Sequence, residues 1–291
     1  MKPFVPYYLA KAYLRSRFLL SRVRGDQPLI VYQMGKVGSA SILESLRALD
    51  MPVAHVHYLT RDGLKRGRTF YYGGATTRLH KRYLPRSRHL FQAENLRHWI
   101  ANDSGSERWR IVTLVREPVA RNISSFFQRL DLLMPDYAEQ YRMNQLRVES
   151  LIERFFQDTL IHDWPLTWHD SQLRPIFGVD VFSSEFPIAK GYKIFNGDHA
   201  DILLIRLENL DTCCRAAFKE FLDLDDFTLV KTNVAKEKPY ASVYDDFRRT
   251  IAFPDDYLTR MYSSKYAQHF YSAEELCNFR ANWAEQLYEK P

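Results

Sequence analysis

Residues 28–49 have the sequence PLIVYQMGKVGSASILESLRAL, which is typical of a buried strand, a turn and a helix. A short apolar run at 28–32 is typical of a central parallel strand, and the isoleucine and leucine residues after position 41 recur at helical spacing. Between them, Gly35 and Gly38 bracket Lys36. Small residues let a backbone approach an anion closely, and the N–H groups at the start of a helix bind it. The stretch therefore predicts a phosphate or sulfate site, and with it a nucleotide-dependent enzyme.

The spacing of this turn restricts the nucleotide. A Walker A loop, GxxxxGK[ST], carries its lysine after the last glycine, whereas Lys36 stands before Gly38. The dinucleotide pattern GxGxxG is absent as well. Taken alone, the turn leaves two interpretations open, an anion site and an ordinary glycine-containing connection between strand and helix.

The rest of the chain alternates strand-like and helix-like segments. Further strands are predicted at 52–59, 89–93, 109–115 and 202–207. Helices are predicted at 119–130, 137–162 and 213–222, and aromatic-rich helices from about residue 257 onward. This order predicts an α/β fold, in which a central parallel sheet is flanked by helices and the C-terminal part is helical. Ligands bind such sheets at the carboxyl ends of the strands.

The composition is that of a globular protein, with 46% of the 291 residues apolar and 14% aromatic. The three cysteines, two of them adjacent at 213 and 214, form neither a disulfide framework nor a zinc-binding spacing. We therefore expect buried thiols and a reducing, cytoplasmic location.

The net charge of +6 comes from the N-terminal segment, because residues 1–25 contain six basic residues and no acid. The rest of the chain is neutral, which argues against nucleic-acid binding. No apolar run in 1–25 approaches the ~20 residues of a transmembrane helix. We predict a separate basic amphipathic helix at 1–25 and a single domain at 26–291. The helix could lie on the inner membrane face or pack on the domain with its basic face in water.

A second anion-binding motif is predicted at 115–127, VREPVARNISSFF. Arg116 leaves a strand end, and Ser124 follows about two turns down the next helix, with Arg121 between them. A guanidinium and a hydroxyl in this arrangement can hold a second phosphate. The alternative is a surface arginine beside Glu117.

These two motifs, QMGKVGSAS at 33–41 and VREPVARNISSFF, resemble the cofactor motifs of sulfotransferases that use 3′-phosphoadenosine 5′-phosphosulfate (PAPS). The closer similarity is to carbohydrate sulfotransferases and to bacterial proteins of capsular polysaccharide synthesis. The resemblance implies a P-loop-like three-layer sandwich, a carbohydrate acceptor and no metal. It also implies phosphosulfate binding by Lys36, Gly38, Ser39, Ala40 and Ser41, 3′-phosphate binding by Arg116 and Ser124, and a cofactor-covering loop with Lys236 or Lys238. The sequence departs from many relatives at Ala40 and at Gln33-Met34.

An acceptor hydroxyl must lose a proton, and histidine titrates in the right range for a general base. His55 and His57 are expected on one face of the second strand, and we favour His57 because it lies nearer the carboxyl end of that strand. Either histidine could instead be a buried structural residue, and His169-Asp170 is a further candidate. Lys36 would stabilise the leaving oxygen.

The basic run at 61–88, which shows no apolar stripe, is either a solvated face or a surface that attracts an anionic saccharide.

Two other functions are compatible with these motifs. A P-loop kinase-like phosphotransferase would need magnesium and an acid at a strand end, for which Glu117 and Glu208 are weak candidates. A non-catalytic nucleotide-binding subunit of a polysaccharide assembly would not need Lys36 or the two histidines. The acceptor and the oligomeric state stay open.

Overall fold

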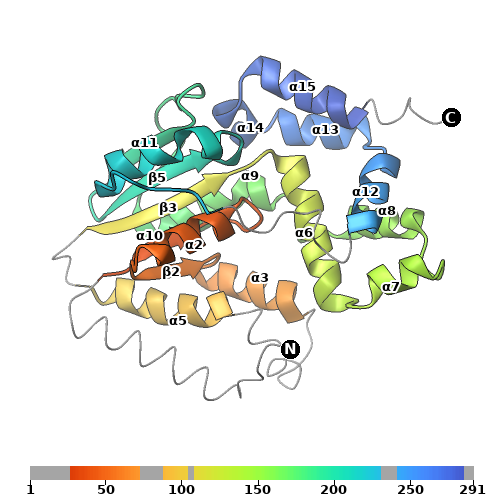
Figure 1. Cartoon of the computed structure of the whole chain (residues 1–291), viewed down its shortest axis with the longest axis horizontal. Coiled ribbons are helices and arrows are strands. Elements are labelled where there is room, and N and C mark those ends of the chain that lie inside the picture. The colour runs from red at the N-terminus through yellow and green to blue at the C-terminus, as the bar shows by residue number, and fades with distance from the viewer. Residues whose placement is uncertain (1–26, 73–87, 104–107, 231–240, 285–291) are drawn as a thin grey trace.

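A five-stranded sheet stands at the centre of the computed structural model, which describes residues 27–72, 88–103, 108–230 and 241–284 (Figure 1). Its strand order is β2-β1-β3-β5-β4. Four strands run parallel, and β4 pairs antiparallel with β5. The bounds are β1 Leu29–Tyr32, β2 Val53–Val56, β3 Trp109–Val115, β4 Tyr192–Asn196 and β5 Ala200–Arg206. The predicted α/β class with parallel strands is confirmed, but the prediction of an all-parallel sheet is wrong at β4.

The antiparallel strand has a local cause. Only residues 197–199 separate β4 from β5, and a parallel pair would need a crossover of a dozen or more residues. The amide of Gly197 donates to the carbonyl of Ala200 at 2.8 Å and closes the connection. The sequence YKIFN also lacks the apolar run that made the buried strands visible.

Helices lie around the sheet (Figure 1). Helix α5 packs on β2, and α11 packs on β4 and β5. In the view of Figure 1, α7, α8 and α12 gather beyond α6, and α13, α14 and α15 lie along the top. Five of the longer helices are α2 Ser39–Ala48, α3 Arg61–Tyr72, α5 Arg88–Ala101, α6 Pro118–Leu133 and α11 Leu210–Leu222. The others are α7 Tyr137–Arg142, α8 Val148–Gln157, α9 Trp164–Trp168, the π-helix η1 His169–Leu173, α10 Arg174–Phe177, the 3₁₀-helix η2 Leu207–Asn209, α12 Ala241–Thr250, α13 Asp255–Tyr262, α14 Lys265–Phe270 and α15 Ala273–Ala284.

Several predicted boundaries need correction. The strand predicted at 89–93 belongs to helix α5, in which Leu90, Ala93 and Leu96 are buried at helical spacing. The helix predicted at 137–162 is two helices, α7 and α8, separated by Asn144 in the left-handed region. The strand predicted at 52–59 ends at Val56. The helical C-terminal part is confirmed by α12 to α15.

The strand order places the two predicted anion motifs together. Strand β2 lies on one side of β1, and β3 lies on the other side. The order of the strands along the sheet therefore reverses at β1. Such a reversal leaves a crevice outside the carboxyl ends of the two strands, where ligands bind. The turn at 33–38 follows β1 and Arg116 follows β3. The P-loop-like three-layer arrangement stays a prediction.

Within the described residues, no helix combines the length and apolarity needed to cross a bilayer. The predicted N-terminal helix, residues 1–25, lies outside those residues. Its membrane contact and the domain boundary after residue 25 therefore stay predictions.

Candidate functional site

The turn after β1 has a backbone suited to an anion. Gly35, Lys36 and Gly38 all adopt left-handed conformations, with φ of 85°, 65° and 88°. Left-handed residues in such a turn direct successive N–H groups toward one concave side. Helix α2 begins at Ser39, and its N-cap Gly38 makes no side-chain cap. The first turn of α2, residues 39–41, also contains no acidic residue. This end of α2 is therefore favourable for an anion.

Gly38 is required by close packing as well as by its conformation. A Cβ atom at this position would lie 2.3 Å from Cδ1 of Leu207, which follows β5. We expect Gly38→Ala to lower the free energy of unfolding by about 2–3 kcal/mol, because a left-handed alanine costs about 1 kcal/mol and Leu207 must also move. Gly178→Ala is the matched control, since Gly178 has φ 72° but nothing within 4 Å of its Cβ position. Urea denaturation of both variants measures the difference, and equal losses would contradict the packing argument.

Gln33 holds the turn together from inside. Its fully buried side chain accepts from the amide of Gly35 at 2.7 Å and donates to Oγ of Ser39 at 2.8 Å. The side-chain nitrogen Nε2 of Gln33 also lies 3.2 Å from Nε2 of His55. Because an amide nitrogen can only donate, His55 accepts through Nε2. Burial lowers the pKa of His55 well below its usual value and keeps the ring neutral. His55 thus supports the turn, and Gln33, a departure from the resembled family, has a structural role.

His57 lies just beyond β2, and one side of its ring faces the turn. Its Nδ1 is 2.9 Å from the carbonyl of Gln33, which only accepts, so Nδ1 carries the proton. Nε2 is then the basic nitrogen of the neutral ring, and it lies 3.8 Å from the Cβ position of Gly35. Burial lowers the pKa of His57 to about 4, and the charges of Arg121 and Lys36 add to the effect. The rings of His55 and His57 are 4.6 Å apart, so the predicted shared face is correct.

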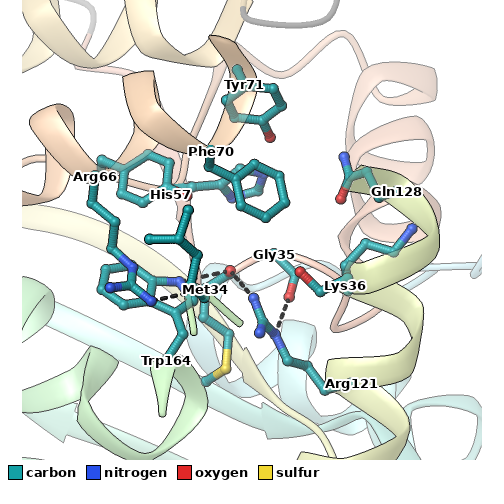
Figure 2. Close-up of a pocket in the computed structure, with 13 residues that line it drawn as sticks. Met34, Gly35, Lys36, His57, Arg66, Phe70, Tyr71, Arg121, Gln128 and Trp164 are labelled. Atoms are coloured by element: carbon teal, nitrogen blue, oxygen red, sulfur yellow. Dashed lines mark hydrogen bonds between the residues drawn. The ribbon is translucent and has the colours of Figure 1, made fainter. Parts of the chain in front are cut away.

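A pocket lies above the turn, where α3, α6 and α9 meet (Figure 2). In Figure 2, the side chain of Lys36 extends toward Gln128. The lining contains three cationic side chains and no carboxylate. It comprises Met34, Gly35, Lys36, His57, Tyr58, Arg66, Phe70, Tyr71, Arg121, Ser125, Gln128, Leu160 and Trp164.

Arg121 lies under the turn and is only 3% exposed. Its Nε donates to the carbonyl of Gly35 at 3.2 Å, and its Nη2 donates to that of Met34 at 3.1 Å (Figure 2). Its Nη1 donates to the carbonyl of Ile161 and to the side chain of Asn122, both at 3.1 Å. Burial lowers the pKa of Arg121 to about 10, so the guanidinium stays charged at neutral pH. Arg121 therefore stabilises the turn and contributes positive charge from below, a role that the sequence did not indicate.

The second motif contacts the first directly. Nη1 of Arg116 donates to the carbonyl of Lys36 at 3.0 Å. Ser124 lies on α6 and is half-buried. The alternative pairing of Arg116 with Glu117 is wrong, because the carboxylate of Glu117 caps α6 by accepting from the amides of Val119 and Ala120.

The carboxylates of Glu117 and Glu208 at the strand ends both accept hydrogen bonds from the protein. Glu117 also accepts from the hydroxyl of Tyr262 at 2.8 Å. Glu208 accepts from the amide of Glu117 at 2.7 Å and from the hydroxyl of Tyr271 at 3.2 Å. Burial raises the pKa of both carboxyl groups. In the described ranges no group of three or more His, Cys, Asp or Glu side chains is placed to hold a metal ion.

His169 and Asp170 lie away from the pocket, and two predicted lysines lie outside the described residues. His169 is buried in η1 beside Trp168, does not line the pocket, and has a pKa lowered to about 3 by burial. Asp170 lies 3.8 Å from Lys265 on the surface. Lys236 and Lys238 lie outside the described residues.

The basic run at 61–88 is part of the pocket wall over its first half. Residues 61–72 form α3, and Leu64, Phe70 and Tyr71 are buried on one side of it. The expectation of a run without an apolar stripe is therefore wrong, because the stripe is interleaved with arginine and lysine at helical spacing. Residues 73–87 of the run lie outside the described ranges.

Comparison with known proteins supports one part of the resemblance. Residues 140–272 match the family model NKWYS, described as "Putative capsular polysaccharide synthesis protein". No curated protein and no solved structure matches the chain. The matched span contains Trp164 and Glu208 but neither the turn at 33–38 nor His57 or Arg116. The similarity to this family therefore does not rest on the anion motifs.

Proposed function

We propose that the chain is a PAPS-dependent sulfotransferase of capsular polysaccharide synthesis, with a P-loop-like core, that sulfates a hydroxyl of a carbohydrate. One observation carries the proposal. The two predicted anion-binding motifs meet at the switch point of the sheet, where Arg116 after β3 donates to the carbonyl of Lys36 after β1. A donor with phosphate groups at both ends needs two such motifs side by side.

The residues fit this donor, which supplies the sulfuryl group. Lys36 and the first turn of α2, with the hydroxyls of Ser39 and Ser41 and the amide of Ala40, would bind the phosphosulfate at the concave side of the turn. Gly38 lets the turn pack closely against β5. Arg116 and Ser124 would bind the 3′-phosphate, and Lys236 or Lys238 would cover the nucleotide.

His57 would act as the general base. Its Nε2 accepts the proton of the acceptor hydroxyl while the hydroxyl oxygen bonds to sulfur. Lys36 stabilises the negative charge that develops on the bridging oxygen as its bond to sulfur breaks. Both residues line the same pocket, so the chain supplies positioning and fixed positive charge without a metal.

Burial holds the pKa of His57 low in the free protein. A histidine of pKa about 4 is neutral at pH 7 but is a weak base. Lys36 and Arg121 contribute to the lowering, and a bound anion offsets their charge. We therefore expect the pKa of His57 to rise when the donor is bound, which would make it a stronger base in the loaded enzyme.

The kinase-like alternative is disfavoured. Its metal-binding acid would be Glu117 or Glu208, and both carboxylates are occupied by backbone amides and tyrosine hydroxyls.

Ligand-induced thermal shifts test the proposal. We expect 3′-phosphoadenosine 5′-phosphate at about 100 times its Kd to raise Tm by about 5 °C or more, with much smaller shifts from adenosine 5′-phosphate and from ATP with magnesium. Arg116→Ala should remove the preference for the 3′-phosphate. Arg110→Ala, at an exposed arginine of β3, the strand that precedes Arg116, should keep it. A preference for ATP with magnesium, or equal responses to all three ligands, would overturn the proposal.

A further inference from the structure

Arg66 of α3 forms the pocket wall above Trp164 (Figure 2). Its guanidinium lies over the Trp164 ring, 4.4 Å from the ring centroid. Its Nη2 donates to the carbonyl of Leu160. Trp164 is itself fixed, because its Nε1 donates to the carbonyl of Met34 at 3.2 Å. Stacking and one hydrogen bond thus hold the planar guanidinium in one orientation.

The charge of Arg66 is not balanced by an ion pair within the described part of the chain. The two acids whose charges act on Arg66 have other partners, since Asp158 pairs with Arg129 and Asp163 lies 3.6 Å from Arg260. A partly buried arginine is normally paired. Among the described residues, Arg66 donates one hydrogen bond, to the carbonyl of Leu160. Most of the five N–H donors of Arg66 therefore remain for a ligand.

Arg66 differs in this respect from Arg121, the other arginine of the pocket. The three nitrogens of Arg121 all donate to carbonyl or amide oxygens of the protein. Arg121 contributes its charge but has little capacity to bind a ligand directly. Lys36 belongs to the turn that would hold the donor. Arg66 is therefore the cation on the acceptor side of the pocket.

We propose that Arg66 binds a carboxylate of the acceptor, so that the substrate is a saccharide with a uronic acid unit. This inference rests on the proposed function. Arg66 lines the same pocket as His57 and Lys36. A carboxylate held by Arg66 then brings a hydroxyl of the same or the adjoining ring to His57.

A carboxylate fits better than a phosphate or a neutral sugar. Carboxylate and guanidinium are both planar and can form two parallel hydrogen bonds. A phosphomonoester carries −1.5 to −2 charge instead of −1, and it would repel the anionic donor more strongly. A neutral sugar would leave the Arg66 charge unpaired in a partly desolvated wall.

Binding measurements in the presence of saturating 3′-phosphoadenosine 5′-phosphate test this inference. The probes are an oligosaccharide containing glucuronic acid, its carboxyl-reduced form, and glucose 6-phosphate. We expect the wild type to bind the first probe at least tenfold more tightly than the other two. Arg66→Gln should lose this preference, and Arg66→Lys, which keeps the charge without the planar fork, should retain part of it.

Arg68→Gln provides the matched control, because Arg68 is an exposed arginine on the same helix and pairs with Glu94. It should bind all three probes like the wild type. If the nucleotide stabilises neither wild type nor variants, the proposed function itself fails. If the nucleotide binds but the wild type does not prefer the uronate probe, or Arg66→Gln keeps the preference, only the carboxylate inference fails. Tighter binding of glucose 6-phosphate, or binding of none of the probes, would also overturn it.

Discussion

Replacing His57 by asparagine should lower kcat for sulfuryl transfer by about 10²- to 10⁴-fold, the range typical of a lost general base. Asparagine keeps a side-chain N–H that can donate to the carbonyl of Gln33, as Nδ1 of His57 does at 2.9 Å. It lacks the basic nitrogen that corresponds to Nε2. The experiment is steady-state transfer of labelled sulfate from PAPS to the saccharide that binds best. A loss in kcat with an unchanged nucleotide Kd would assign the effect to chemistry.

The pH profile sharpens this expectation. His57 must be neutral to act, so the rate falls as the pH falls through its pKa. In the free enzyme this pKa is about 4, and it rises when a bound anion offsets Lys36 and Arg121. The acidic limb of kcat should therefore lie at higher pH than that of kcat/KM.

His162→Gln is the control for His57→Asn, because His162 is also buried but lies outside the pocket, with Nε2 2.8 Å from the carbonyl of Phe155. It should change stability without moving either limb of the pH profile. Activity of His57→Asn within threefold of the wild type would exclude His57 as the base.

The same titration affects stability. In the unfolded chain His57 binds a proton near pH 6.5, whereas in the folded protein it does so near pH 4. Its contribution is therefore fully present above pH 6.5 and is lost as the pH falls toward 4. The unfolding free energy of His57→Asn should depend less steeply on pH across this window.

The sequence predicted those elements that can be recognised from their own residues alone. The turn after β1 was visible because Gly35, Lys36 and Gly38 follow an apolar strand and precede a helical repeat. Strand β3 was predicted with its observed bounds, 109–115. Strand β4 was missed because only its pairing with β5 makes it a strand.

The pocket was the least predictable part, because its walls come from distant segments. Arg121 donates to the carbonyl of Gly35, which is 86 residues away in the sequence. Trp164 donates to the carbonyl of Met34, which is 130 residues away. Gln33 looked like a departure from the resembled family until its side chain was placed between Gly35 and Ser39. A buried polar residue between the apolar Tyr32 and Met34 was the one local signal that Gln33 has a structural role.

Removing the Lys36 ammonium should lower kcat by about 10³-fold, since a single group that stabilises developing charge is worth about 10²–10³. Lys36→Met keeps the length of the side chain, and Lys65→Met, at an exposed lysine of α3, is the control. The loss should appear mainly in kcat, because the N–H groups of the turn and Arg116 still bind the nucleotide. An equal loss in Lys65→Met, or a loss only in nucleotide affinity, would contradict a role for Lys36 in the transition state.

Lys36→Gly separates the catalytic role of the Lys36 side chain from its effect on the conformation of the turn. Lys36 has φ 65°, a conformation that costs a lysine about 1 kcal/mol and costs glycine almost nothing. Glycine should therefore leave Tm unchanged or raise it, while kcat falls as far as in Lys36→Met. Urea denaturation and transfer kinetics on the same preparations measure both effects. A stable but inactive Lys36→Gly would mean that the strained lysine is retained for chemistry, whereas a strongly destabilised one would mean that the side chain holds the turn together.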